Sequence, residues 1–419
     1  MKIAMFTDAY YPRINGVAVS VKSYAEELSK MGHKICIVCP DYTDNYIDPF
    51  NKERLFKTYH YEYQTDASKE MKILRIPSDK IFFSKEDRNA RLTQYRRIKK
   101  EMDAFNPDVI HINSEFTMGW YAIIYSRSRK IPVAYTFHTL WEDYISNYIA
   151  YLPAVLAHKI GKKLVTFYLK RADEIIVPTK RIASMVEHYG IKKETDILPT
   201  GIQKEILHCD KKIVPQFISQ LYKILPLKKK NILLYVGRIV KEKNLDFLFD
   251  VLPLVRQKFP DTVLLFVGGG PELENLKSRA KKLPYSWNIC FAGYRKREEL
   301  AYFYNISDIF VFPSLTETQG LVTIEAMMSG LPVVAIGEMG TTDVMQGDHG
   351  GFMVKNDVKD FAEKVIELLE NKELYKEKCA EAKKWSSQWA MSSLAPKLLG
   401  FYEKAINEHK KKEENQNDS

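Results

Sequence analysis

The segment Asp308–Pro332 constrains the fold of this chain most strongly, because a buried strand, a polar loop and a helix follow one another within it. Ile309–Phe312 is wholly apolar with β-branched residues at alternate positions, which predicts a short buried strand. Ser314–Gln319 is mostly polar and predicts a loop. The apolar residues beyond it recur at helical spacing as far as Gly330 and Pro332, which are typical of a helix end. This order is that of an α/β fold.

Two carboxylates stand out in this segment. Glu317 lies in the loop, and Glu325 lies within the helix. The backbone N–H groups of Gly320–Val322 come at the amino end of that helix, where anions such as phosphate bind. A ligand with both phosphate and hydroxyl groups could use all three features. The alternative is that both acids are solvated surface residues, as most carboxylates are.

A second strand–loop unit carries two cations. Ile232–Val236 predicts a strand, and Gly237 and Arg238 follow it directly. Lys243 comes shortly afterwards, in the predicted opening turn of the next helix. The planar fork of an arginine and the point charge of a lysine together suit a diphosphate group.

The first half of the chain also begins with a βαβ pattern. Lys2–Phe6 and Ile35–Cys39 predict strands on either side of a loop and a helix. Gly16, in that loop, either lets a ligand approach the backbone closely or is an ordinary turn glycine. His138 follows the predicted strand Val133–Phe137, at the sheet edge where such folds bind ligands. A histidine in this place is either catalytic or structural.

Two basic segments of the first half predict helices. Lys85–Phe105 combines an apolar face with a face rich in arginine and lysine. The stretch from Tyr144 to Ala172 contains no acidic residue, and within it Val155–Arg171 predicts a basic amphipathic helix. Such a helix either binds an anionic membrane surface or packs in a core with its basic face in solvent. The candidate membrane-binding residues are Lys159, Lys162, Lys163, Lys170 and Arg171.

Length and composition set broad limits on the class of protein. A chain of 419 residues, of which 45% are hydrophobic and 28% charged, predicts a globular protein of two domains or one large domain. The five cysteines include Cys36 and Cys39 inside an apolar run, which predicts buried free thiols in a reducing compartment. A net charge of +10 is compatible with nucleic acid or an anionic membrane surface as partner, and equally with no particular partner. No signal peptide or membrane-spanning run is predicted.

The sequence of Asp308–Pro332 resembles the signature of glycosyltransferase family 4, a family of retaining enzymes that use nucleotide-sugars. The matching positions are Pro313, Ser314, Glu317, Gly320, Leu321, Glu325, Ala326, Met327, Gly330, Pro332, Val333, Val334 and Ala335. The resemblance extends over most of the chain. It implies the α/β GT-B fold, in which two Rossmann-like domains face each other across a cleft.

The same resemblance implies roles for individual residues. Glu317 would face the transferred sugar, and Glu325 would bind the ribose hydroxyls. Arg238 and Lys243 would bind the donor diphosphate, as would the loop at Gly16. The full set of implied donor-binding residues is Gly16, Arg238, Lys243, Tyr294, Thr318, Gln319, Gly320, Leu321, Val322 and Glu325.

The segment that follows the strand at 133–137 resembles the subgroup of the family that glucosylates diacylglycerol. His138–Tyr144 has the subgroup's succession of His-Thr, an aromatic residue, Glu and Tyr, which would place His138 near the sugar. One departure lies upstream, where His111-Ile112-Asn113 replaces the frequent His-x-His. The catalytic set implied is then Glu317, His138, Arg238 and Lys243.

The function expected on this resemblance is transfer of a hexose, glucose from UDP-glucose, to diacylglycerol with retention of the α-configuration. No Asp-x-Asp motif stands at a predicted strand end, so neither a metal nor any other cofactor is expected. The expected partners are the donor, the lipid acceptor and an anionic membrane, with no nucleic acid, at the cytoplasmic face of the cell membrane. The alternatives are another acceptor (a polyprenyl-linked glycan, phosphatidylinositol or a soluble sugar), an epimerase or phosphorylase on the same fold, and a non-catalytic membrane-binding protein.

The predicted domain organisation follows from the two runs of α/β pattern on either side of an irregular middle. The pattern gives a first domain at residues 1–202, a linker region at 203–228 and a second domain at 229–390. The resemblance implies that the first domain faces the acceptor and the membrane, with a helix at about 391–406 packing back on it, and that the second binds the nucleotide-sugar. The tail at 407–419 is expected to be disordered, because it is polar and highly charged.

Overall fold

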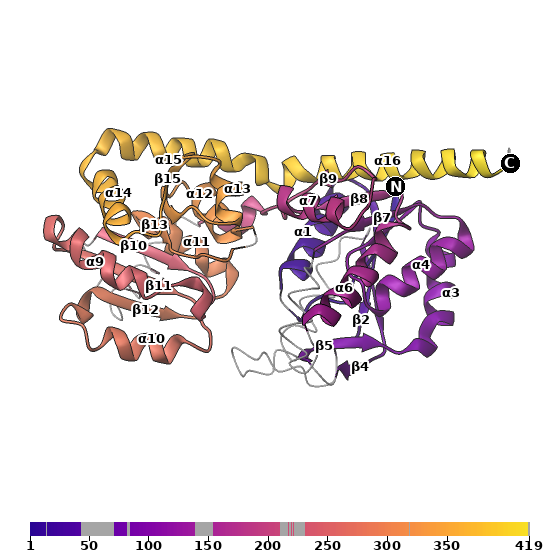
Figure 1. The fold of residues 1–419 in the computed structure, drawn as a ribbon, viewed down its shortest axis with the longest axis horizontal. Coiled ribbons are helices and arrows are strands. Elements are labelled where there is room, and N and C mark those ends of the chain that lie inside the picture. The colour runs from indigo at the N-terminus through magenta and orange to yellow at the C-terminus, as the bar shows by residue number, and fades with distance from the viewer. Residues whose placement is uncertain are drawn as a thin grey trace. The chain divides into compact units, whose positions relative to one another are not determined.

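The structure, a computed structural model, describes residues 1–13, 15–42, 71–81, 84–138, 154–209, 231–317 and 319–417, with positions 217, 219 and 221 between them. It divides into two compact units. Unit 1 comprises Met1–Gly201 and Met391–Ser419, and unit 2 comprises Ile202–Ala390. Each unit contains one parallel sheet with its own buried apolar core (Figure 1).

Unit 1 is built on a seven-stranded parallel sheet in the order β3-β2-β1-β6-β7-β8-β9. Its strands are nearly continuous apolar runs, as expected of a parallel sheet covered by helices on both faces. Cys36 and Cys39 are buried free thiols in β2, as the sequence predicts. The strands are β1 (Lys2–Phe6), β2 (Lys34–Pro40), β3 (Met71–Ile76), β6 (Val109–Ile112), β7 (Val133–Thr136), β8 (Glu174–Val177) and β9 (Asp196–Ile197).

The helices of unit 1 connect these strands and cover the sheet. Asn15 caps the first of them, its side chain accepting a hydrogen bond of 2.8 Å from the N–H of Ala18. The helices are α1 (Gly16–Lys30), η1 (Leu92–Gln94), α3 (Tyr95–Phe105), α4 (Thr117–Arg129), α6 (Ala154–Leu169), α7 (Lys180–His188) and α16 (Met391–Asn417).

The helix predicted over Lys85–Phe105 is correct only in its second half. Ser84–Ala90 forms the strand β5, which pairs antiparallel with β4 (Ser78–Ile81). The N–H of Ala90 donates to the Thr117 hydroxyl, and the Arg88 side chain is buried. Pairing with a neighbouring strand, which the local charge pattern does not reveal, outweighed the helical periodicity of this segment.

The last helix is longer than the sequence predicts. The expected end is near residue 406 with a disordered tail at 407–419, but α16 continues to Asn417. It packs on α1 and on β7 and β8, and lies along unit 1 as the yellow helix of Figure 1. His409 and Lys412 both contact the buried carboxylate of Asp173, at 3.0 and 2.7 Å. These contacts give the charged end of the helix a partner, which a freely solvated tail would lack.

Unit 2 is built on a six-stranded parallel sheet in the order β12-β11-β10-β13-β14-β15, the order of a Rossmann fold. Its strands are β10 (Asn231–Val236), β11 (Thr262–Val267), β12 (Ile289–Gly293), β13 (Ile309–Phe312), β14 (Val333–Ile336) and β15 (Gly351–Val354). The predicted strand at 309–312 is therefore confirmed.

The helices of unit 2 alternate with these strands. They are η2 (Lys204–Leu207), η3 (Lys241–Lys243), α9 (Phe247–Lys258), α10 (Leu273–Ala280), η4 (Ser286–Asn288), α11 (Arg297–Ile306), α12 (Leu321–Met328), α13 (Gly340–Met345), α14 (Val358–Glu370), α15 (Lys372–Ser386) and η5 (Ser387–Trp389). Among the described helices of both units, none is long and apolar enough to cross a bilayer.

Candidate active site

The strand order of unit 2 places its candidate residues at one edge of the sheet. From the central pair β10 and β13 the chain proceeds outward in opposite directions, which opens a crevice beyond their carboxyl ends where ligands bind in doubly wound folds. Arg238 lies in the loop after β10, and Glu317 lies in the loop after β13. Residues far apart in sequence thus meet at the switch point of this sheet.

The loops after β10 and β13 are joined by an ion pair. The Nζ atom of Lys243, in η3, donates to Oε2 of Glu317 over 2.8 Å, and both side chains are largely buried. The Glu317 carbonyl also accepts a hydrogen bond of 2.8 Å from the N–H of Gly340, at the start of α13. A lysine and a carboxylate held side by side can recognise an anion and a hydroxyl group at adjacent positions.

A glycine cluster braces the loop that carries Arg238. A Cβ atom at Gly268 would lie 1.9 Å from the Gly237 carbonyl oxygen, and one at Gly270 would lie 2.2 Å from that of Ile239. The Ile239 N–H donates to the Gly269 carbonyl over 2.9 Å. Only glycine permits this close approach of two loops, so the glycines after β11 serve to position the arginine loop. The Arg238 side chain itself is exposed.

Glu325 lies within α12, after Glu317 in the sequence, and its carboxylate has two hydrogen-bond partners. Its side chain is only 6% exposed, and Oε1 accepts a hydrogen bond of 3.0 Å from Nη2 of Arg297. Oε2 accepts one of 3.0 Å from the buried Tyr304 hydroxyl. Burial, with the Glu325 charge alongside, raises the pKa of Tyr304 well above its usual value, so this hydroxyl remains a proton donor. Both oxygens of Glu325 are therefore held in a fixed orientation by α11.

The amino end of α12 presents backbone N–H groups close to Glu317. Gly320 caps the helix in the left-handed region, at φ 68°, which favours glycine. The N–H groups of Leu321 and Val322 fall in the first turn, where a helix does not use its own donors. Gln319 is buried, and Thr318 lies outside the described residues. Tyr294 follows β12, and its ring is half-exposed.

Unit 1 has a corresponding edge, at the carboxyl ends of β1 and β6. Asp8, after β1, is buried and accepts hydrogen bonds from the Ser114 and Thr117 hydroxyls and from the Met118 N–H, at 2.6, 3.0 and 3.1 Å. Burial raises the pKa of Asp8 to about 6, although these hydrogen bonds act in the opposite direction. Gly16 is exposed in the first turn of α1, with open space around its Cβ position.

His138 lies at the end of β7 and is paired with the residue that replaces the second histidine of the family pattern. Its Nε2 atom donates to Oδ1 of Asn113 over 3.1 Å, and the Asn113 amide in turn contacts the His111 carbonyl. Burial lowers the pKa of His138 to about 4, so the imidazole is neutral near pH 7. With Nε2 protonated, Nδ1 is left as a hydrogen-bond acceptor. His111 is buried between Thr136 and Tyr402 and has a structural role.

The predicted basic helix is present as α6, although its basic residues differ in their exposure and in their contacts. Lys159, Lys163 and Lys170 are exposed. Lys162 lies over the Tyr189 ring at 5.6 Å. Arg171 stacks on the Phe167 ring at 3.7 Å and donates to the Phe167 carbonyl. Val165, Tyr168 and Leu169 are buried in the core, so α6 has both a packed face and an exposed basic face.

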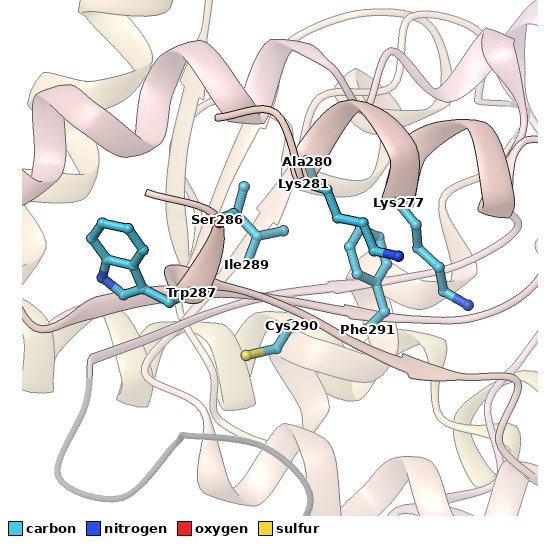
Figure 2. Close-up of a pocket in the computed structure, with 8 residues that line it drawn as sticks. All are labelled: Lys277, Ala280, Lys281, Ser286, Trp287, Ile289, Cys290 and Phe291. Carbon is cyan, nitrogen blue, oxygen red and sulfur yellow. The ribbon is translucent and has the colours of Figure 1, made fainter. Parts of the chain in front are cut away.

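A pocket of about 350 Å³ lies elsewhere in unit 2, between α10 and the start of β12. In Figure 2, Trp287 lies at one side and Lys277 and Lys281 at the other. It contains none of the predicted site residues. Among the described residues, no group of three or more His, Cys, Asp or Glu side chains could hold a metal ion.

This fold and these strand-end loops define the class of protein. Residues 14–205 match the family described as Glycosyltransferase Family 4, and residues 219–385 match the family described as Glycosyl transferases group 1. Solved structures agree on the fold. Anabaena HepE in complex with UDP-glucose superposes with a TM-score of 0.68 at 16% identity, over 96% of this chain and 98% of that one. The chain belongs to the glycosyltransferases with a GT-B fold.

Two groups of relatives place the chain more narrowly within the class. It is 30% identical to the alpha-monoglucosyldiacylglycerol synthase of Streptococcus pneumoniae, over 88% of this chain and 78% of that protein. It is 27% identical to the synthase of the same name from Acholeplasma laidlawii, over 89% of each chain. It is also 28% identical, over 51% of this chain and 57% of the relative, to a GDP-mannose-dependent phosphatidylinositol monomannoside mannosyltransferase of Mycobacterium tuberculosis. The family membership predicted from the motifs is confirmed, and the chain is a glycosyltransferase related to glycolipid-synthesising enzymes.

Sequence reasoning missed the residues that hold the predicted ones in place. Arg297 and Tyr304 lie on α11, and each contacts Glu325 only because α11 packs beside α12. Asp8 and Asn113 likewise act through contacts between strand-end loops. Asn113 carried one signal, its position in place of a family histidine, whereas Arg297, at the start of a charged helix, carried none.

Proposed function

We propose that the protein transfers glucose from UDP-glucose to diacylglycerol with retention of the α-configuration, at the surface of an anionic membrane. The observation that carries this proposal is the Lys243–Glu317 pair at the switch point of unit 2, 2.8 Å apart and beside the amino end of α12. A cation, a carboxylate and the N–H groups of a helix amino end at one sheet edge suit a ligand that joins a diphosphate to a sugar.

In this proposal, different residues of unit 2 bind different parts of the donor. Arg238 and Lys243 bind the diphosphate and stabilise the charge that develops on it as the sugar leaves. Glu317 accepts hydrogen bonds from the sugar, and Glu325 accepts them from the ribose hydroxyls. Tyr294 contacts the base. From the family resemblance we further propose that Gly16 contributes to diphosphate binding and that neutral His138 offers Nδ1 to a hydroxyl group of the sugar. No side chain is assigned as general base, and a phosphate oxygen of the leaving group takes the acceptor proton.

The acceptor is proposed from the relatives and from the surface of unit 1. The two synthases matched over most of this chain are named for monoglucosyldiacylglycerol. The exposed lysines of α6, together with Arg171, suit binding to anionic lipid headgroups, to which each basic residue near the surface contributes about 1 kcal/mol. The M. tuberculosis relative supports a second candidate, transfer of mannose from GDP-mannose to a phosphatidylinositol glycolipid.

One experiment separates the two candidates. Purified protein is incubated with radiolabelled UDP-glucose or GDP-mannose and with diacylglycerol or phosphatidylinositol monomannoside in detergent micelles, and the lipid products are separated by chromatography. We expect label in the lipid only with UDP-glucose and diacylglycerol, and an α-linkage by NMR. Glu317→Ala is the inactive control. Labelling only from GDP-mannose would replace the proposed donor, and a β-linked product would refute retention.

A further inference from the structure

The surface between α4 and α6 carries an unusual group of exposed apolar side chains. Trp120 and Ile124 of α4 are 45% and 44% exposed, and Ile160 of α6 is 46% exposed. Large apolar residues are normally buried, and several exposed on adjoining helices mark an interaction site. α4 and α6 lie next to each other in unit 1 (Figure 1), and the rings of Trp120 and Phe167 are 4.7 Å apart.

The packing of the two helices directs these side chains outward. A Cβ atom at Gly119 would lie 2.9 Å from the Tyr168 ring, so α6 approaches α4 closely at that glycine. Tyr168 is buried there and donates to the Glu115 carbonyl over 3.0 Å. Trp120 and Phe167, each one residue away from this contact, therefore lie toward the outer side of the helix pair. Ile124 follows Trp120 at the spacing of one helical turn.

Basic groups surround these apolar side chains. Arg171 stacks on Phe167 at 3.7 Å, and Arg127 lies close enough to Arg171 to add to the effect of burial in lowering the pKa of Arg171. Lys163 is exposed one turn before Phe167 on α6. In the described part of the chain, no carboxylate forms an ion pair with Arg127, Lys163 or Arg171. Among the described residues, the surface thus combines an exposed tryptophan, two exposed isoleucines and basic side chains with no carboxylate partner.

We propose that this α4–α6 surface, formed by Trp120, Ile124, Ile160, Phe167, Lys163 and Arg127, docks on an anionic lipid bilayer, with Trp120 inserted at the headgroup boundary. Tryptophan favours that boundary because its ring is apolar and its N–H is polar. The apolar centre would replace contacts with water by contacts with acyl chains, and the basic rim would face lipid phosphates. This inference rests on the proposed membrane location, which it refines by adding α4 to the basic helix.

The experiment compares variants by sedimentation with vesicles of phosphatidylcholine, with and without phosphatidylglycerol. We expect Trp120→Ala to lower partitioning onto the anionic vesicles roughly tenfold, the effect of losing one buried large apolar side chain. Trp120→Phe should retain most of the binding. Arg127→Glu combined with Lys163→Glu should abolish the preference for anionic vesicles. Trp287→Ala is the matched control, because Trp287 is 65% exposed beside two lysines in unit 2.

Insertion is measured directly by quenching of tryptophan fluorescence with brominated lipids. The chain has five tryptophans, and we expect Trp120→Phe to remove most of the quenching seen in the wild type. Unchanged sedimentation of both Trp120→Ala and the double charge variant would overturn the proposal, as would quenching that disappears only in Trp287→Ala. Transfer to micellar diacylglycerol tests the proposed reaction separately. A protein that binds vesicles through Trp120 but transfers no glucose would leave this inference standing and refute the reaction.

Discussion

Replacing Arg297 by methionine tests whether the orientation of Glu325 determines donor binding. Methionine preserves much of the side chain's apolar length but removes the hydrogen bond of 3.0 Å to Oε1. Glu325 is 6% exposed, so water has little access to replace the lost donor. A hydrogen bond to a charged group contributes about 1.5–3 kcal/mol. If Glu325 binds the ribose hydroxyls, the misplaced carboxylate should weaken donor binding by roughly 10- to 150-fold.

The effect should appear in donor affinity and not in turnover, because the ribose is remote from the reacting sugar and contributes uniform binding. Calorimetry with UDP and with 2′-deoxy-UDP provides the specific assay. Wild type should prefer UDP, and both Arg297→Met and Tyr304→Phe should lose much of that preference. Glu325→Ala should likewise raise the donor KM. Arg279→Met is the matched control, because it breaks an exposed pair with Asp246 in the same unit.

Two results would refute this reasoning. If Arg297→Met lowered kcat and left the donor KM unchanged, Arg297 would act at the reacting sugar. If the variant bound UDP weakly but still preferred it to 2′-deoxy-UDP by the wild-type factor, Glu325 would not be the ribose ligand. Absence of UDP binding in the wild type would instead refute the proposed donor.

Three further predictions concern the other parts of the site. Lys243→Ala or Arg238→Ala should lower kcat in the transfer assay by a factor corresponding to about 3–4 kcal/mol of barrier, with an unchanged melting temperature; near-normal turnover would disprove the diphosphate assignment. Asn113→Ala, which removes the acceptor for Nε2 of His138, should lower the transfer rate roughly 2- to 13-fold. Asn113→Asp should move the acidic limb of the pH–rate profile to higher pH, and a wild-type profile in both variants would show that Asn113 does not position His138. The pKa of Asp8 is raised from 3.8 to about 6 in the folded protein, so ionisation of Asp8 lowers the stability of the fold by at most about 3 kcal/mol as pH rises from about 4 to 6. In denaturant titrations, Asp8→Asn should therefore gain stability relative to wild type across that pH range. A stability difference that stays constant with pH would contradict this.

The sequence by itself determined the elements whose signals are local. The strand β13, the loop after it and the helix α12 follow from an apolar run, a polar interval and helical periodicity ended by Gly330 and Pro332. The resemblance carried by the same residues predicted the family, which the relatives confirm. Such features depend on residues within one or two helical turns of each other, so a single segment contains the information.

Only the tertiary structure decided which groups face one another. Lys243 and Glu317 meet across 74 positions of sequence, and Arg297 reaches Glu325 from 28 positions away. The same holds for β5, where pairing with β4 overrode a helical charge pattern, and for the end of α16, where Asp173 supplies a partner. The exposure of Trp120 likewise depends on how α4 and α6 pack against each other. Contacts between distant segments depend on how whole elements pack, and that information resides in no single stretch of the chain.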